Sequence, residues 1–204
     1  MDDPPTAYPA RVSTTESRPN PFLQGNLAPV DVETTAFDLE VTGVLPRELN
    51  GRYLRNGPNP LGAVNEAKYH WFSGHGMVHG IRIRDGRAEW YRNRFVETES
   101  VRRHRGERVK LPELAKGTGN THVVAHNGSL MALEEGHWPW LLDCELNTTG
   151  YENYGGALTC SMTAHPKICP DTGELLAFSY FSFQPPYVHY VRISADGRVQ
   201  QVEP

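Results

Sequence analysis

The stretch AHPKICPDTGE, residues 164–174, decides the fold of this chain. Apolar, strand-like sequence lies on both sides of it, over residues 157–163 and residues 175–183. Pro170-Asp171-Thr172-Gly173 predicts a tight turn, because proline fixes φ, aspartate can bond the backbone two residues on, and glycine accepts a positive φ. We therefore expect a hairpin in which His165 is the last polar residue of the first strand, aimed into a shared centre. A lone histidine beside a turn is more often a structural or surface residue.

Three further pairs of alternating runs predict hairpins, because Asp-Gly or Asn-Gly between such runs suits a tight turn. They lie at residues 78–96 around Asp85-Gly86, at residues 121–135 around Asn127-Gly128, and at residues 187–202 around Asp196-Gly197. The other indicated elements are an alternating run at 37–41, one helical turn at 111–116, and a short strand at 51–55 that Asn56-Gly57-Pro58 stops. Recurrent hairpins without a long helical segment predict an all-β repeat architecture, of which a propeller is one option.

The composition fits one domain of 204 residues with many turns, since it has 38% hydrophobic residues, 19 Gly and 16 Pro. The net charge is −4, and the basic run at residues 102–105 predicts a solvated face rather than a nucleic-acid site. Three cysteines without regular spacing argue against a disulfide framework. Residues 1–24 predict a disordered tail that lacks the apolar run of a secretory signal, so we expect a cytoplasmic protein.

The opening stretch resembles the motif His-Pro-Lys-x-Asp-Pro-x-Thr-Gly-Glu of the carotenoid cleavage oxygenases. These are non-haem iron enzymes that split alkenes of carotenoids, apocarotenoids and stilbenes. The resemblance also covers residues 51–60, 70–80 and 119–126, and it runs from about Gly25 to the last residue. One departure is Cys169, where the family usually has aspartate. We expect this change to alter the turn rather than the metal site.

The resemblance implies the architecture, because members of this family look like seven-bladed β-propellers with iron on the central axis. Family members are more than twice as long as this chain. Residues 25–204 are therefore expected to form the amino-terminal blades of a partial propeller, roughly three of them, truncated at the carboxyl terminus. A part-propeller has an open sheet edge and an uncovered core face. We expect the free chain to be marginally stable or prone to aggregate.

The resemblance also implies site residues. His165 corresponds to the first of four iron-binding histidines, and neutral imidazole suits Fe(II). Glu135 matches a glutamate that orients a ligand histidine, whose presumed position lies beyond Pro204. Thr121 matches a residue that lies beside the vacant coordination position and shapes oxygen access. From the residues alone, Glu135 reads as a solvated carboxylate at a strand end and Thr121 as an ordinary β-branched strand residue.

The remaining histidines show no ligand pattern. His70, His75 and His79 have zinc-like spacing, but the glycines among them make a shared helical face improbable, so we interpret them as turn and strand residues. The other histidines without a partner pattern are His122, His126, His137 and His189.

The substrate is indicated by what the sequence lacks. Family members that cleave phenolic stilbenes look as though they grip the phenol with a lysine beside the orienting glutamate and with an upstream tyrosine. This chain has Glu134 in the lysine position and no tyrosine between Arg92 and Glu134. An acid cannot replace lysine as a donor to phenolate, so a carotenoid or apocarotenoid is favoured. The aromatic run at residues 178–183 would then line an apolar tunnel or, as in most strands, serve packing.

The resulting hypothesis is an Fe(II)-dependent dioxygenase that adds O₂ across a conjugated double bond of a hydrophobic polyene and gives two carbonyl products. A peripheral membrane contact of the full-length protein is left open. One imidazole cannot hold catalytic iron, so we expect the isolated chain to be inactive. The alternatives are a truncated or binding β-repeat module without catalysis, a lignostilbene-type dioxygenase, and an isomerase relative with the same iron site.

Overall fold

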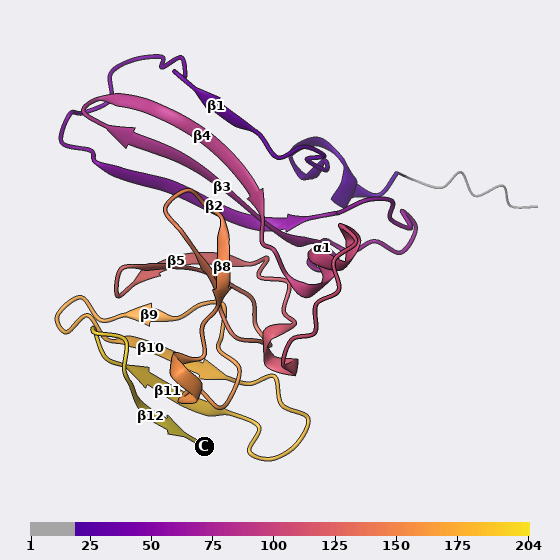
Figure 1. Ribbon diagram of the computed structural model, residues 1–204, viewed down its shortest axis with the longest axis vertical. Coiled ribbons are helices and arrows are strands. Elements are labelled where there is room, and N and C mark those ends of the chain that lie inside the picture. The colour runs from indigo at the N-terminus through magenta and orange to yellow at the C-terminus, as the bar shows by residue number, and fades with distance from the viewer. Residues whose placement is uncertain (1–18) are drawn as a thin grey trace, which may run out of the picture.

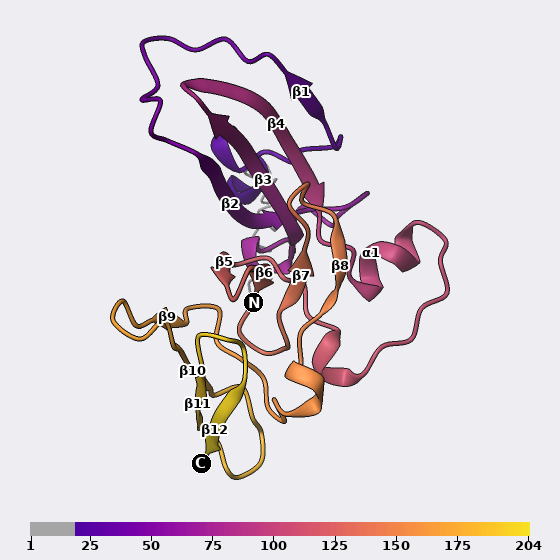
Figure 2. The same cartoon turned by 60° about the vertical axis from the view of Figure 1, so that its left-hand side comes forward.

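A computed structural model describes residues 19–204 as three four-stranded antiparallel sheets that follow one another along the molecule (Figures 1 and 2). This part of the chain has one short α-helix, α1 (Glu99–His104). It also has five 3-10 turns: η1 (Pro21–Leu23), η2 (Gly25–Leu27), η3 (Trp71–Ser73), η4 (Glu113–Ala115) and η5 (Tyr154–Gly156). The prediction of an all-β architecture is confirmed.

The first sheet has the order β1-β4-β3-β2, from β1 (Thr35–Phe37), β2 (Gly51–Asn59), β3 (His75–Arg84) and β4 (Arg87–Phe95). The connection between β3 and β4 is the predicted tight turn, with φ of 50° at Asp85 and 75° at Gly86. Two positive φ values in succession define a type I′ turn, which matches the twist of the flanking strands. The strand predicted over residues 37–41 is wrong except at Phe37, because Asp38 takes a φ of 52° and ends β1 there.

The predicted end of the β2 strand at Asn56-Gly57-Pro58 is wrong, since β2 continues through these residues to Asn59. In its sheet β2 pairs only with β3, so it is an edge strand, where proline is tolerated. Pro58 lies opposite Gly76, whose amide instead donates to the Thr118 carbonyl at 3.0 Å and whose carbonyl accepts from Val96 at 2.8 Å. Pro58 has no amide hydrogen to donate, and its lack leaves neither the amide nor the carbonyl of Gly76 unpaired.

The second sheet has the order β5-β6-β7-β8 and the third has the order β12-β11-β10-β9. The β5–β6 and β11–β12 hairpins form where the sequence predicts them, with φ of 46° at Asn127, 73° at Gly128 and 78° at Gly197. The strands of the second sheet are β5 (His122–His126), β6 (Ser129–Leu133), β7 (Trp140–Leu142) and β8 (Thr148–Tyr151). Those of the third are β9 (Lys167–Ile168), β10 (Leu175–Ser179), β11 (His189–Ile193) and β12 (Val199–Glu203).

The strand expected over residues 157–163 is not formed, although this segment is buried. Its side chains alternate in the way that suggested a strand, and Leu158, Cys160 and Met162 are all buried. The backbone instead bonds in two directions: the Met162 amide donates to the His137 carbonyl at 3.2 Å, and the Thr163 amide donates to the Phe178 carbonyl at 2.8 Å. The segment is thus an extended link between the second and third sheets.

The turn at residues 170–173 forms as predicted, with cysteine in the position that departs from the motif. The Gly173 amide donates to the Cys169 carbonyl at 2.9 Å, and the Cys169 amide donates to the Glu174 carbonyl at 2.8 Å. Gly173 has a φ of 71°. His165 therefore lies two residues before β9, at the end of the buried link rather than at the end of a strand.

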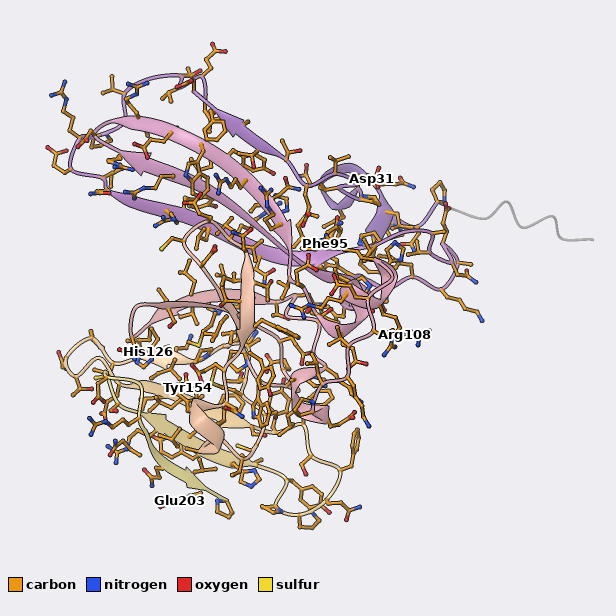
Figure 3. The ribbon with its side chains drawn as sticks, viewed as in Figure 1. Asp31, Phe95, Arg108, His126, Tyr154 and Glu203 are labelled. Atoms are coloured by element: carbon orange, nitrogen blue, oxygen red, sulfur yellow. The ribbon has the colours of Figure 1, made fainter. Side chains whose placement is uncertain are left out.

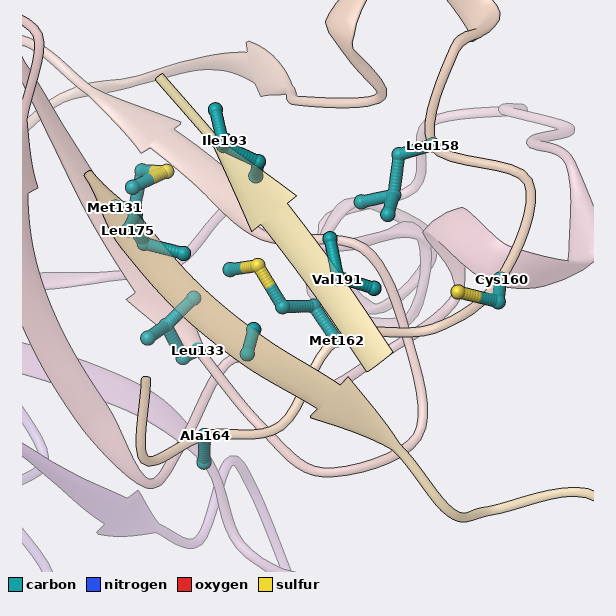
Figure 4. Packing of buried hydrophobic residues seen from close by; sticks show 10 residues of the cluster. Met131, Leu133, Leu158, Cys160, Met162, Ala164, Leu175, Val191 and Ile193 are labelled. Carbon is teal, nitrogen blue, oxygen red and sulfur yellow. The ribbon is translucent and has the colours of Figure 1, made fainter. Parts of the chain in front are cut away.

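Two apolar cores hold the three sheets together, one at each junction. Between the first and second sheets, Val78 and Trp90 pack with Ala132, Trp140, Leu142 and Leu146. Between the second and third sheets, Met131 and Leu133 pack against the buried link and the third sheet (Figure 4). The residues of this second core are Met131, Leu133, Leu158, Cys160, Met162, Ala164, Leu175, Ala177, Val191 and Ile193.

The first described residues and the basic run lie outside the residues of these two cores. Residues 1–18 of the expected tail lie outside the described residues, whereas Asn20 caps η1 and donates to the carbonyls of Glu66 and Tyr69 at 2.7 and 2.8 Å. The basic run falls on α1, which the sequence did not predict, and Arg105 pairs with Glu97 at 2.6 Å and with Glu33 at 3.2 Å. Arg108 follows at the edge of the molecule (Figure 3). Among residues 19–204, no helix has the length and apolarity to cross a bilayer.

Candidate active site

The predicted site residues come from three different segments that meet at the end of the second sheet. Glu135 follows β6 by two residues, Thr121 directly precedes β5, and His165 closes the buried link. The Thr121 amide donates to the Leu133 carbonyl at 2.9 Å, so Thr121 lies across from the end of β6. The hairpin register of the second sheet therefore brings Thr121 and Glu135 close together across fourteen residues of sequence.

Glu135 contacts His165 directly. Its Oε1 lies 3.3 Å from Nε2 of His165, while its Oε2 accepts hydrogen bonds from the Thr163 hydroxyl and the Ala164 amide, both at 3.0 Å. Only 23% of the Glu135 side chain is exposed. Glu135 is therefore not the solvated carboxylate that the residues alone suggest. The histidine expected beyond Pro204 stays a prediction, and the imidazole that this chain places against Glu135 is His165.

The ring of His165 also stacks on His122, a histidine that has no partner pattern in the sequence. The two rings stack with centroids 6.1 Å apart and planes 25° apart. Nδ1 of His122 donates to the Ala164 carbonyl at 2.9 Å, because a carbonyl oxygen can only accept. No spacing rule connects residues 122 and 165, because their proximity follows from the packing of the second sheet on the buried link.

Thr121 makes its side-chain hydrogen bond away from the Glu135–His165 pair. Its hydroxyl donates to Oδ1 of Asn120 at 3.0 Å, and the side chain is exposed. Asn120 is buried and donates through Nδ2 to the carbonyls of Phe72, at 3.2 Å, and Gly74, at 2.7 Å. Thr121 therefore lies at the junction between the first and second sheets, with an exposed side chain beside the stacked imidazole of His122.

Glu134 has a different environment from its neighbour Glu135. Its Oε1 accepts from the Gly136 amide at 3.1 Å and pairs with Nδ1 of His137. The loop packs so closely that a Cβ on Gly117 would lie 2.8 Å from this oxygen. Exposed aromatic side chains of the β10–β11 region lie over the same loop. Burial, followed by the charge of Glu135, raises the pKa of Tyr180 above its ordinary value.

The donor set fits one metal ligand from this chain. Within the described residues, no group of three or more His, Cys, Asp or Glu side chains is arranged to hold a metal ion. The His165 side chain is 62% exposed, so its imidazole is open to a further group. Oε2 of Glu135 accepts from two donors, which leaves only Oε1 free. This arrangement suits a carboxylate that orients an imidazole better than one that binds the metal itself. If a metal took Nε2 of His165, Oε1 of Glu135 would be left for another imidazole.

Comparison with known proteins shows the family of the chain. The sequence matches the family model described as Retinal pigment epithelial membrane protein over residues 27–204. The carotenoid cleavage oxygenase of Mycobacterium tuberculosis is 46% identical over 188 residues, with 89% of this chain and 38% of the relative covered. The carotenoid 9,10(9',10')-cleavage dioxygenase 1 of Arabidopsis thaliana is 41% identical over 216 residues, with 89% of this chain and 39% of the relative covered.

Solved structures show the same fold. The lignostilbene dioxygenase of Pseudomonas brassicacearum superposes with a TM-score of 0.78 at 34% identity, covering 89% of this chain and 42% of that protein. Cobalt-substituted apocarotenoid oxygenase of Synechocystis superposes with a TM-score of 0.69 at 23% identity, covering 86% and 42%. The chain thus spans about two fifths of the length of the proteins it matches. Its three sheets are part of a seven-bladed β-propeller, and the chain belongs to the carotenoid cleavage oxygenase family.

Proposed function

We propose that the protein to which this chain belongs is an Fe(II)-dependent dioxygenase that cleaves a conjugated double bond of a carotenoid or apocarotenoid into two carbonyl products. The observation that carries the proposal is the contact between Glu135 and His165, with the carboxylate fixed from behind by Thr163 and Ala164. An exposed imidazole held by an oriented carboxylate is the arrangement expected of one member of a histidine ligand set.

The proposed roles are those that the family resemblance implies for these residues, and the Glu135–His165 contact supports the first two. His165 supplies one iron ligand, Glu135 orients an imidazole of the set, and Thr121 flanks the position where oxygen enters. Bound iron would supply the redox chemistry that activates O₂. The chain supplies this single recognised ligand, so we expect the isolated 204-residue chain to form no product.

The substrate class is supported by the side chains around the site. Phe178, Tyr180 and Phe181 are exposed in the β10–β11 region and contact one another, with ring centroids 5.5 and 5.8 Å apart along the series. Such a wall suits a polyene, because it offers apolar surface with few hydrogen-bonding groups. The carboxylate of Glu134, paired with His137, offers no cation to a phenolate. The proposed substrate is therefore a carotenoid or apocarotenoid.

The experiment uses the complete coding sequence, expressed and loaded with Fe(II). We expect two carbonyl products from an apocarotenoid, each labelled when ¹⁸O₂ is supplied, and none from a hydroxystilbene. His165→Ala should abolish both product and bound iron. Phenolic aldehydes from the hydroxystilbene, with none from the polyene, would establish the lignostilbene-type alternative, which the structural match to a lignostilbene dioxygenase keeps as the second candidate. Conversion of the polyene without cleavage would point to an isomerase.

We further propose a cytoplasmic protein that takes its polyene from a membrane by peripheral contact. The support is the row of exposed apolar side chains that continues past the aromatic wall, with Phe183 89% exposed and Val188 54% exposed. Co-sedimentation of the complete protein with phospholipid vesicles tests this contact. Recovery of Phe183→Ser in the vesicle pellet at the wild-type level would count against it.

A further inference from the structure

The buried link between the second and third sheets carries one polar side chain that reaches the candidate site. Thr163 is 1% exposed, and its amide donates to the Phe178 carbonyl of β10 at 2.8 Å. This main-chain bond fixes Thr163 to the third sheet. Its β-branched side chain has few rotamers, so the hydroxyl keeps a defined direction.

The hydroxyl of Thr163 makes two hydrogen bonds whose direction is determined. The His165 amide can only donate, so Oγ1 accepts from it at 3.1 Å. The single hydroxyl proton is then free to donate to Oε2 of Glu135, at 3.0 Å. Thr163 therefore connects the backbone of His165 to the carboxylate that contacts the His165 ring.

The orientation of Glu135 depends on this hydroxyl. The terminal torsion of a glutamate is broad and roughly two-fold, so nothing in the side chain itself selects which way its oxygens face. Thr163 and the Ala164 amide engage Oε2 together, and this leaves Oε1 facing Nε2 of His165 at 3.3 Å. Loss of the hydroxyl would leave one donor and a carboxylate that is free to turn toward solvent.

We propose that Thr163 is a positioning residue: its hydroxyl sets the direction in which Glu135 presents its second oxygen to the imidazoles of the site. The inference rests on the proposed function for its catalytic meaning, because Glu135 and His165 take their roles from it. The claim that the Thr163 hydroxyl orients Glu135 rests only on contacts within this chain. A test on the metal-free chain therefore separates the two.

The test compares nitrogen NMR shifts of the His165 imidazole in four forms of the chain, at one pH where the ring is neutral and at a protein concentration low enough to keep the chain monomeric. Thr163→Val keeps the shape and removes the hydroxyl, and Thr163→Ser restores it. Ser161→Ala is the matched control, because the Ser161 hydroxyl is also buried in the link but bonds to Ser179, at 2.7 Å, and not to Glu135. Thermal midpoints check that each variant is folded.

We expect Thr163→Val to move the Nε2 resonance to that of a free, exposed imidazole, with wild-type shifts in Thr163→Ser and Ser161→Ala. An unchanged His165 resonance in folded Thr163→Val would overturn the proposal. If that variant does not fold, the wild-type chain decides: the His165 amide must be protected from hydrogen exchange by its bond to Thr163, and rapid exchange would also overturn the proposal. Neither outcome changes the result of the oxygenase assay. If that assay failed, the proposed function would be refuted, but the positioning role of Thr163 would not.

Discussion

Glu134 and Glu135 are adjacent acids at the end of β6, and their different partners show how the site is made selective. Glu134 is engaged by the Gly136 amide and His137, whereas Glu135 turns to Thr163, Ala164 and His165. Both residues follow the last residue of β6, Leu133, so the end of this strand sets where each carboxylate begins. The end of the β5–β6 hairpin therefore positions the turn from which Glu135 reaches the imidazole.

The cysteine in the β9–β10 turn should be the most reactive thiol of the chain. Hydrogen bonds from the Thr172 hydroxyl, and then from the backbone amides of Thr172 and Asp171, lower the pKa of the Cys169 thiol. Burial raises the pKa of the Cys160 thiol. Because the thiolate is the nucleophile, we expect iodoacetamide to modify Cys169 first and Cys160 last near neutral pH.

Mass spectrometry of the native chain over a pH series measures these rates. Exposed Cys144 is the internal reference. The advantage of Cys169 should shrink as the pH rises and every accessible thiol ionises, and Thr172→Val should reduce it at neutral pH. Equal rates for Cys144 and Cys169 at neutral pH would show that the turn does not stabilise the thiolate.

At the scale of single elements, the Asn127-Gly128 turn sets the register on which Glu135 depends. Gly128 has a φ of 73°, and a Cβ built on it would meet no atom within 4 Å. Gly128→Ala therefore tests backbone strain without a clash, and we expect it to lower the free energy of unfolding by about 1 kcal/mol. Gly150→Ala is the control, because Gly150 has equal space and lies in β8 without a positive φ. Urea midpoints of both variants, at low protein concentration, give the comparison, and an equal midpoint for the two would remove strain as the cause.

The hairpins were predictable because their signal is local. Asp85-Gly86 and Asn127-Gly128 can take two positive φ values, and the alternating runs beside them allow only one kind of connection. The same reasoning failed at β2 and at residues 157–163, where the outcome depends on neighbours. Pro58 is accepted because β2 is an edge strand, and the link alternates in burial because two sheets enclose it.

The site was predictable only where a motif named its residues. His165 and Glu135 come together in the structure, but their contact carries no signal in spacing, since thirty residues and a whole β-hairpin separate them. Thr163 and His122 had no signal at all. Thr163 resembles any residue of an apolar run, and the stacking of His122 on His165 follows from tertiary packing.

At the scale of the whole molecule, the three sheets are packed unequally. The second sheet is covered on both faces, by Ala132 and Trp140 toward the first sheet and by Met131 and Leu133 toward the third. The first sheet is covered on one face through Val78 and Trp90, whereas its other face is covered only at one end, where Met77 and Phe95 pack with Val101 of α1. On this second face lie two open cavities, of about 410 and 430 Å³, and Val30, Arg55 and His79 line both of them.

This open face should make the chain self-associate. Tyr53 is 65% exposed on it, beside Ile81 and Tyr91, and Arg55 forms no ion pair with any acid among residues 19–204. An exposed apolar sheet face beside an edge strand favours association. We expect sedimentation velocity to show mass rising with protein concentration and Tyr53→Ser to reduce that rise. Val44→Ser is the control, since Val44 is 93% exposed but lies in a loop away from this face. A chain that stayed monomeric at high concentration and melted cooperatively would contradict this prediction. Such a chain would fold without a partner for its open face. That result would favour the alternative of a binding module over a propeller that needs its remaining blades.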